Sequence, residues 1–100
     1  MSGEVRVLVR HVADSADAVE SAYHRVSAQL ADVPGLLGNE LLRGVDDERA
    51  FLVVSRWRDL AAFRSWESGA AHRESTSPLR PFRDHGGGRP FEIYRVTAAH

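Results

Sequence analysis

In the first third of the chain, the apolar residues recur at first about every two residues, as in a strand, and then about every 3.6 residues, as in a helix. Residues 4–12, EVRVLVRHV, alternate in polarity, which predicts a strand with its valines on one face. Residues 15–32 carry an apolar stripe on one side of a helix that Asp14 or Ser15 can cap. The stripe consists of Val19, Ala22, Tyr23, Val26, Leu30 and Val33.

The rest of the chain predicts two strands, a second helix and a last strand. Pro34 and Gly35 end the first helix, and Asp59 can cap the second. The segments are strands at 36–43 and 50–57, a helix at 59–69, a short helical or irregular stretch to 82, a loop at 83–89 and a strand at 90–98. The order β-α-β-β-α-β predicts one α+β domain over residues 1–100, a ferredoxin-like four-stranded antiparallel sheet with two helices on one face.

The third predicted strand is apolar on both faces in its first half. Phe51 and Val53 point one way, while Leu52 and Val54 point the other. Two helices cover only one face of a sheet, and an exposed apolar face usually marks an interface. We therefore expect a homodimer whose sheets pack face to face. The alternative is a monomer in which residues 69–90 fold back over the second face.

The composition argues against several classes of function. The net charge is −1, from 13 basic and 14 acidic residues, so nothing predicts binding to nucleic acid or to a membrane surface. There is no cysteine, which excludes disulfides, thiol catalysis and cysteine metal sites. The N-terminus has no long apolar run, so a soluble cytoplasmic protein is expected.

The histidines offer no paired ligand motif. None stands three to five positions from another, so no metal site is predicted. His11 closes the first strand and is expected at the surface. The glycine-rich segment 84–90 is expected to be a loop, and whether it gates a cavity stays open. The five histidines are His11, His24, His72, His85 and His100.

Trp66 and His72 are the candidate catalytic residues. Trp66 lies at the edge of the second helix's buried stripe, where a large ring can face a cavity; ordinary core packing is the alternative. His72 follows the end of that helix, where the chain can fold it back toward Trp66. An imidazole takes up a proton near neutral pH, although a solvated surface histidine also fits this position.

Five further residues are candidates for substrate binding. Tyr23 lies on a buried stripe with a hydroxyl that needs a partner. Asn39 is polar within an apolar strand, and Arg56 can hold an anion; a bulge beside Gly38 and a solvated charge are the respective alternatives. The remaining two are the aromatic residues Trp57 and Phe63.

Two stretches resemble the antibiotic biosynthesis monooxygenase family. They are FLVVSRWRDLAAFRSWESGAAHRESTSPLRPF, residues 51–82, with a strand ending in Trp, an AFxxW helix and a downstream His, and VPGLLGNELLR, residues 33–43. The resemblance implies a dimeric α+β barrel of two ferredoxin-like units, with a pocket between helices and sheet. Trp66 and His72 match family positions often found at the pocket.

The family includes oxygenases that act on aromatic polyketide intermediates without metal or flavin, quinol-oxidising enzymes and haem-degrading enzymes. The haem-degrading branch is associated with an Asn on the first strand, which EVRVLVRH lacks, and the spacing from Trp66 to His72 is shorter. The resemblance therefore implies a cofactor-independent monooxygenase that uses O2 on a phenol, anthrone or hydroquinone. A non-redox polyketide cyclase or ligand-binding accessory protein is the alternative, and a haem-binding or haem-degrading protein is the third.

Overall fold

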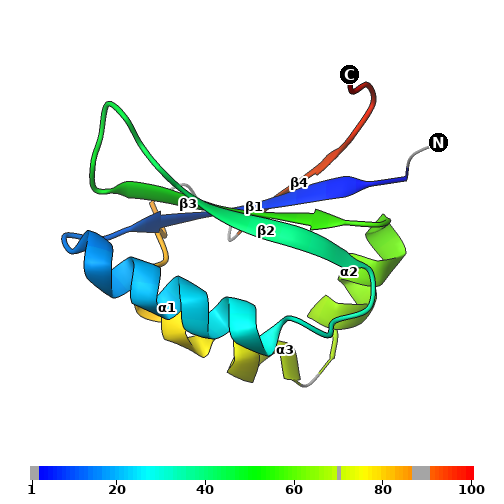
Figure 1. Ribbon diagram of the computed structural model, residues 1–100, viewed down its shortest axis with the longest axis horizontal. Helices are drawn as coiled ribbons and strands as arrows, with labels where there is room; N and C mark the ends of the chain where they lie inside the picture. The colour runs from blue at the N-terminus through cyan, green and yellow to red at the C-terminus, as the bar shows by residue number, and fades with distance from the viewer. Residues whose placement is uncertain (1–2, 70, 87–90) are drawn as a thin grey trace.

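The computed structural model describes residues 3–69, 71–86 and 91–100 and has the predicted ferredoxin-like α+β fold (Figure 1). The elements are β1 (Val5–Val12), α1 (Ala16–Gln29), β2 (Leu36–Arg43), β3 (Ala50–Trp57), α2 (Leu60–Glu67), α3 (Ala71–Ser75), the 3₁₀ helix η1 (Ser77–Phe82) and β4 (Glu92–Arg95).

The four strands form one antiparallel sheet in the order β2-β3-β1-β4. Val5 of β1 pairs with Trp57 of β3, and the alternation from this pair sets which side chains face the helices. The β2–β3 register shifts between Leu36 and Gly38, so the ladder has an irregularity just before Asn39. Figure 1 shows the helices gathered on one side of this sheet.

Both α1 and α2 are capped at their N-termini by residues that the sequence predicted. The Ser15 hydroxyl accepts from the backbone N–H of Ala18 at 3.1 Å, and the Asp59 carboxylate accepts from that of Ala62 at 2.8 Å. The helix α1 ends earlier than the predicted residue 32, because the backbone turns at Leu30 ahead of Pro34. None of the helices in the described ranges is long and apolar enough to cross a membrane.

The core has two apolar clusters on the helix side of the sheet. One lies beneath α1 and contains Val19, Ala22 and Val26; the other contains Trp57 and Phe63 and lies beneath α2. Trp66 packs partly buried against both clusters, so α2 places this ring where they meet.

The 3₁₀ helix η1 packs beside α1, with Leu79 buried in the α1 cluster, and α3 contacts α2 and η1. This corrects the monomer alternative, since residues 71–82 lie on the side of the sheet that α1 already covers (Figure 1). The described residues leave the second face open, where the Leu42 and Tyr94 side chains stay 43% and 55% exposed.

The last strand is shorter than the predicted 90–98. It pairs with only the first half of β1, from Val5 to Leu8. Further along that edge, β1 instead meets the segment after η1: His11 forms a bridge with Arg83, and the Asp84 N–H donates to the Arg10 carbonyl at 3.0 Å. The loop expected at 84–90 lies partly outside the described residues, which stop at 86 and resume at 91, so gating by it stays a prediction.

Candidate functional site

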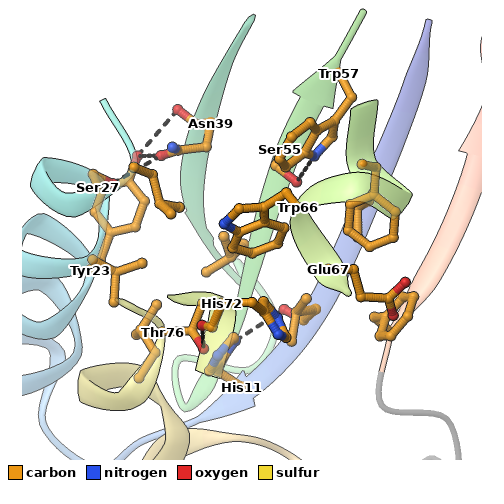
Figure 2. Close-up of a pocket in the computed structure, with 18 of the residues that line it drawn as sticks. His11, Tyr23, Ser27, Asn39, Ser55, Trp57, Trp66, Glu67, His72 and Thr76 are labelled. Carbon is orange, nitrogen blue, oxygen red and sulfur yellow. Dashed lines mark hydrogen bonds between the residues drawn. The ribbon is translucent and has the colours of Figure 1, made fainter. Parts of the chain in front are cut away.

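A cavity of about 140 Å³ lies between the sheet and the helical segments (Figure 2). Its sheet side is formed by Val7, Val9 and Val53, and α1 contributes Val26 and Leu30. These apolar side chains exclude water from their part of the cavity, which strengthens any polar interaction made inside it.

Aromatic rings form one wall of the cavity. Trp57 is 1% exposed, and its ring centroid lies 5.3 Å from that of Trp66 and 5.5 Å from that of Phe63. Phe91 continues the wall, 5.6 Å from Phe63. The Trp57 indole N–H donates to the Ser55 hydroxyl at 2.9 Å, which fixes the ring and satisfies its only donor.

Trp66 and His72 are in contact, as predicted from the direction of the chain after α2. The ring centroids are 4.4 Å apart with an interplanar angle of 84°, so one ring meets the other edge to face. The short helix α3 begins just after α2 and presents His72 to the cavity. No hydrogen bond joins the His72 ring nitrogens to any residue that the structure describes.

The environment of His72 favours the neutral imidazole. Burial lowers the pKa of His72 below its usual 6.5, and Arg83 and Arg80 lower it further, whereas the Glu67 carboxylate raises it. A neutral imidazole with a nitrogen free of protein hydrogen bonds can accept a proton from a molecule in the cavity.

A second set of polar groups, which we call the amide cluster, consists of Tyr23, Ser27 and Asn39. The Tyr23 hydroxyl donates to the Asn39 side-chain oxygen and lies 3.2 Å from its backbone carbonyl. The Ser27 hydroxyl donates to the same side-chain oxygen at 3.1 Å. Because the oxygen of Asn39 takes both hydroxyls, the two N–H groups of its amide point elsewhere and bond to none of the described residues.

His11 and Arg83 also line the cavity, and neither was predicted as a site residue. The expectation that His11 lies at the surface is wrong, since its side chain is 3% exposed and lines the cavity. It extends the helix-facing side of β1, in phase with Val5, Val7 and Val9. Burial lowers its pKa, and the nearby Arg83 lowers it further, against a hydrogen bond to the Val9 carbonyl that raises it. We call His11, His72 and Arg83 the basic cluster.

The structure brings most of the predicted site residues to one cavity. His72, Trp66, Tyr23, Asn39, Trp57 and Phe63 all line it. Arg56 does not line the cavity. It pairs with Arg6 on the opposite face of the sheet, where its side chain is exposed. Its guanidinium lies over Gly38, where an added Cβ would come within 2.6 Å of it. The prediction that Arg56 binds the substrate is therefore corrected, because strand neighbours point to opposite faces and Trp57 occupies the inner one.

Several further lining residues lacked a usable signal in the sequence. They are Ser27, Ser55, Glu67, Thr76 and Arg83. The alternation of β1 could have indicated His11, whereas Arg83 follows two prolines with no periodicity to orient it. Within residues 3–69, 71–86 and 91–100, no three His, Cys, Asp or Glu side chains gather as a metal site would require.

Comparison with known proteins gives a consistent result for the family. A family model described as antibiotic biosynthesis monooxygenase matches residues 4–76. A variant of SnoaB, a cofactor-independent oxygenase from Streptomyces nogalater, has a crystal structure that superposes with a TM-score of 0.75 at 25% identity, covering 99% of this chain and 96% of that one.

Four curated relatives match in sequence, including the two that follow. Protein SchA of Streptomyces halstedii is 29% identical over 93 residues, covering 92% of this chain and 24% of SchA. A mycobilin-producing heme oxygenase of Mycobacterium tuberculosis is 42% identical over 48 residues, covering 48% of this chain and 45% of that protein. The chain thus spans about a quarter of the first relative and under half of the second.

Proposed function

The chain belongs to the antibiotic biosynthesis monooxygenase family, and from this premise we propose that it is a small cofactor-independent monooxygenase for aromatic, polyketide-type substrates. The substrate is a phenol, anthrone or hydroquinone, and O2 is the co-substrate. One observation carries the proposal: the His72 imidazole, without a described hydrogen-bond partner, meets the Trp66 ring at an apolar and aromatic cavity.

The chemistry begins with a proton transfer to His72. Loss of the proton leaves an electron-rich anion, which passes one electron to O2; the resulting radical pair combines through a new carbon–oxygen bond to give a peroxide anion. The His72 imidazolium returns its proton to this anion, which gives the hydroperoxide. For an anthrone, loss of water from the hydroperoxide then gives the quinone. One anthrone and one O2 give one quinone and one water, so the substrate loses the electrons that O2 gains.

The other residues of the cavity hold and shield the reacting ring. Trp66 packs against its face, and the free N–H groups of the Asn39 amide donate to an oxygen that gains negative charge. A cavity close to this volume in another protein holds one benzene ring. We therefore expect the reacting ring inside the cavity of about 140 Å³ and the rest of a larger substrate toward its open side.

Oxygen uptake tests the proposal. The protein is mixed with a model anthrone without added metal or flavin, and O2 consumption and quinone formation are followed together. We expect uptake above the spontaneous rate, reduced sharply in His72→Ala and Trp66→Phe and unchanged in Arg25→Met, which alters an exposed arginine. Binding of the anthrone without any O2 uptake would instead support the non-redox cyclase or accessory protein.

We also propose that the second face of the sheet forms a homodimer. Its apolar side chains come from all four strands and include exposed Leu42 and Tyr94 and half-buried Leu52. The family is typically dimeric, and covering such a face excludes water from it.

Sedimentation of the protein at micromolar concentration tests the dimer. Wild type is expected at twice the protomer mass, and Leu52→Glu is expected to dissociate because it buries a charge in the interface. Val45→Glu, on the turn after β2 where the side chain is 94% exposed, is the matched control. A wild-type protein that sediments as one protomer would contradict the proposal.

Haem binding is a second candidate, favoured by the local similarity to a heme oxygenase. The described cavity of about 140 Å³ has room for one aromatic ring and is too small for the four-ring macrocycle of a haem. Titration with haem separates the candidates: a Soret band that saturates at one equivalent supports haem binding, and an unchanged spectrum dismisses it.

A further inference from the structure

His11 and Arg83 stand side by side on the cavity although they are far apart in sequence. Their backbones form an antiparallel bridge beyond the end of β4. Residues paired in this way project their side chains to the same face, with Cβ atoms roughly 4.5–5.5 Å apart. Both side chains line the cavity.

The hydrogen bonding of His11 determines which of its nitrogens can meet a ligand. Nδ1 lies 3.0 Å from the Val9 carbonyl oxygen, which can only accept, so Nδ1 carries the proton. Burial keeps the ring neutral by lowering its pKa. In the neutral ring Nε2 is then an acceptor, and it bonds to none of the residues in the described ranges.

Arg83, in contrast to the acceptor of His11, offers hydrogen-bond donors. Its Nε–H is buried without a hydrogen-bond partner, the only such side-chain nitrogen or oxygen among the described residues. No ion pair joins its guanidinium to a carboxylate in that part of the chain. A buried donor left unpaired is unfavourable, so a ligand oxygen that accepts from Arg83 binds with a gain that solvent does not already supply.

We propose that His11 and Arg83 form a subsite for two neighbouring oxygens on one edge of an aromatic ligand. A hydroxyl of the ligand donates to His11 Nε2, and the adjacent carbonyl, hydroxyl or oxyanion accepts from Arg83. The ligand class is an aromatic ring oxygenated at adjacent or peri positions. As a statement about substrate, this rests on the proposed oxygenase function.

The pairing of one acceptor with one donor favours this class over two others. A carboxylate has only acceptor oxygens, so one of them would face the lone pair of His11 Nε2. A para-hydroquinone carries its oxygens at opposite ends of the ring and reaches only one member of the pair.

Anaerobic binding of two isomers tests the subsite. The probes are 1,2- and 1,4-dihydroxynaphthalene, and binding is followed by quenching of the tryptophan fluorescence from the cavity wall. Wild type is expected to bind the 1,2 isomer about tenfold more tightly, the effect of one hydrogen bond to a charged group. Equal affinities for the two isomers would overturn the proposal.

Substitutions of His11 and Arg83 test whether these residues cause the preference for the 1,2 isomer. His11→Phe and Arg83→Met are each expected to reduce the ratio of affinities to about one, while His11→Gln, whose side-chain oxygen is an acceptor, retains part of it. Arg25→Met is the control and keeps the wild-type ratio. Should His11→Phe not fold, Arg83→Met decides, and a wild-type ratio in Arg83→Met contradicts the proposal.

The absence of oxygen separates this test from that of the proposed function. Loss of the isomer preference with anthrone oxidation intact refutes the subsite alone. A clear preference without any oxygen uptake refutes the oxygenase and leaves the subsite standing.

Discussion

The amide cluster and the basic cluster border the same cavity but use their hydrogen bonds differently. In the amide cluster, the Tyr23 and Ser27 hydroxyls both donate to the Asn39 side chain. In the basic cluster, no hydrogen bond joins the described side chains to one another, and the Arg83 Nε–H has no partner. Figure 2 shows Tyr23, Ser27 and Asn39 on one side of Trp66 and the two histidines on another.

This difference separates a structural role from a chemical one. The Tyr23 and Ser27 hydroxyls and the Asn39 side-chain oxygen satisfy each other, hold α1 against β2 and leave only the Asn39 N–H groups for a ligand. Groups left unsatisfied in an apolar cavity bind a ligand strongly and can exchange a proton with it. We therefore expect substitutions in the amide cluster to change stability most, and substitutions in the basic cluster to change activity most.

Removing the His72 imidazole is expected to have the largest effect. A positioned general base contributes about 10²–10⁴-fold to the rate, so His72→Ala should lower kcat by that factor. Ser27→Ala, in the amide cluster, should lower it no more than a few-fold. Steady-state oxygen uptake measures both, and equal losses in the two variants would remove the distinction between the clusters.

The pH dependence of the rate is the next largest effect. A general base must be unprotonated, so kcat/KM should rise about tenfold per pH unit up to the pKa of His72 and then level off. Burial, with Arg83, lowers this pKa below 6.5, so the plateau should begin below pH 6.5. Because the Glu67 carboxylate raises this pKa, Glu67→Gln should move the rising limb to lower pH. A limb centred above pH 6.5 would argue against His72 as the base.

In the amide cluster, Asn39→Ala is expected to reduce stability. It removes the acceptor of two hydroxyls, one of which, from Ser27, then has no described partner, and should cost about 1–3 kcal/mol. His72→Ala should cost less, because no hydrogen bond to the ring is lost. Urea denaturation compares the two variants, and a larger loss in His72→Ala would reverse the assignment of roles.

The smallest effect is expected for Tyr23→Phe. Asn39 keeps the bond from Ser27, so the loss should be about 1 kcal/mol. Ser68→Ala is the control, since its hydroxyl bonds to the Ser65 carbonyl at an exposed position, and its unfolding free energy should stay near that of wild type. A Tyr23→Phe variant as stable as this control would show that the Tyr23 bond contributes little.

Much of the site could be recognised from the sequence because helical and strand periodicity report which face of an element is buried. Trp66, Phe63 and Tyr23 lie on apolar stripes, and Trp57 is in phase with the inner residues of β3. The same alternation places Arg56 on the other face, so its position next to Trp57 along the chain does not bring it to the cavity. His11 was missed because a polar residue at a strand end usually meets solvent.

By itself the sequence determined the order of the elements, the cap at Asp59, a first cap at Asp14 or Ser15 and the apolar faces that the helices cover, because these depend on residues within a few positions of one another. Only the tertiary structure decided that His11 meets Arg83, that Asn39 accepts from Tyr23, and that residues 71–82 join α1 rather than the open face. Such contacts join segments distant along the chain, and their geometry follows from how the sheet and the helical layer pack together, which no local pattern encodes.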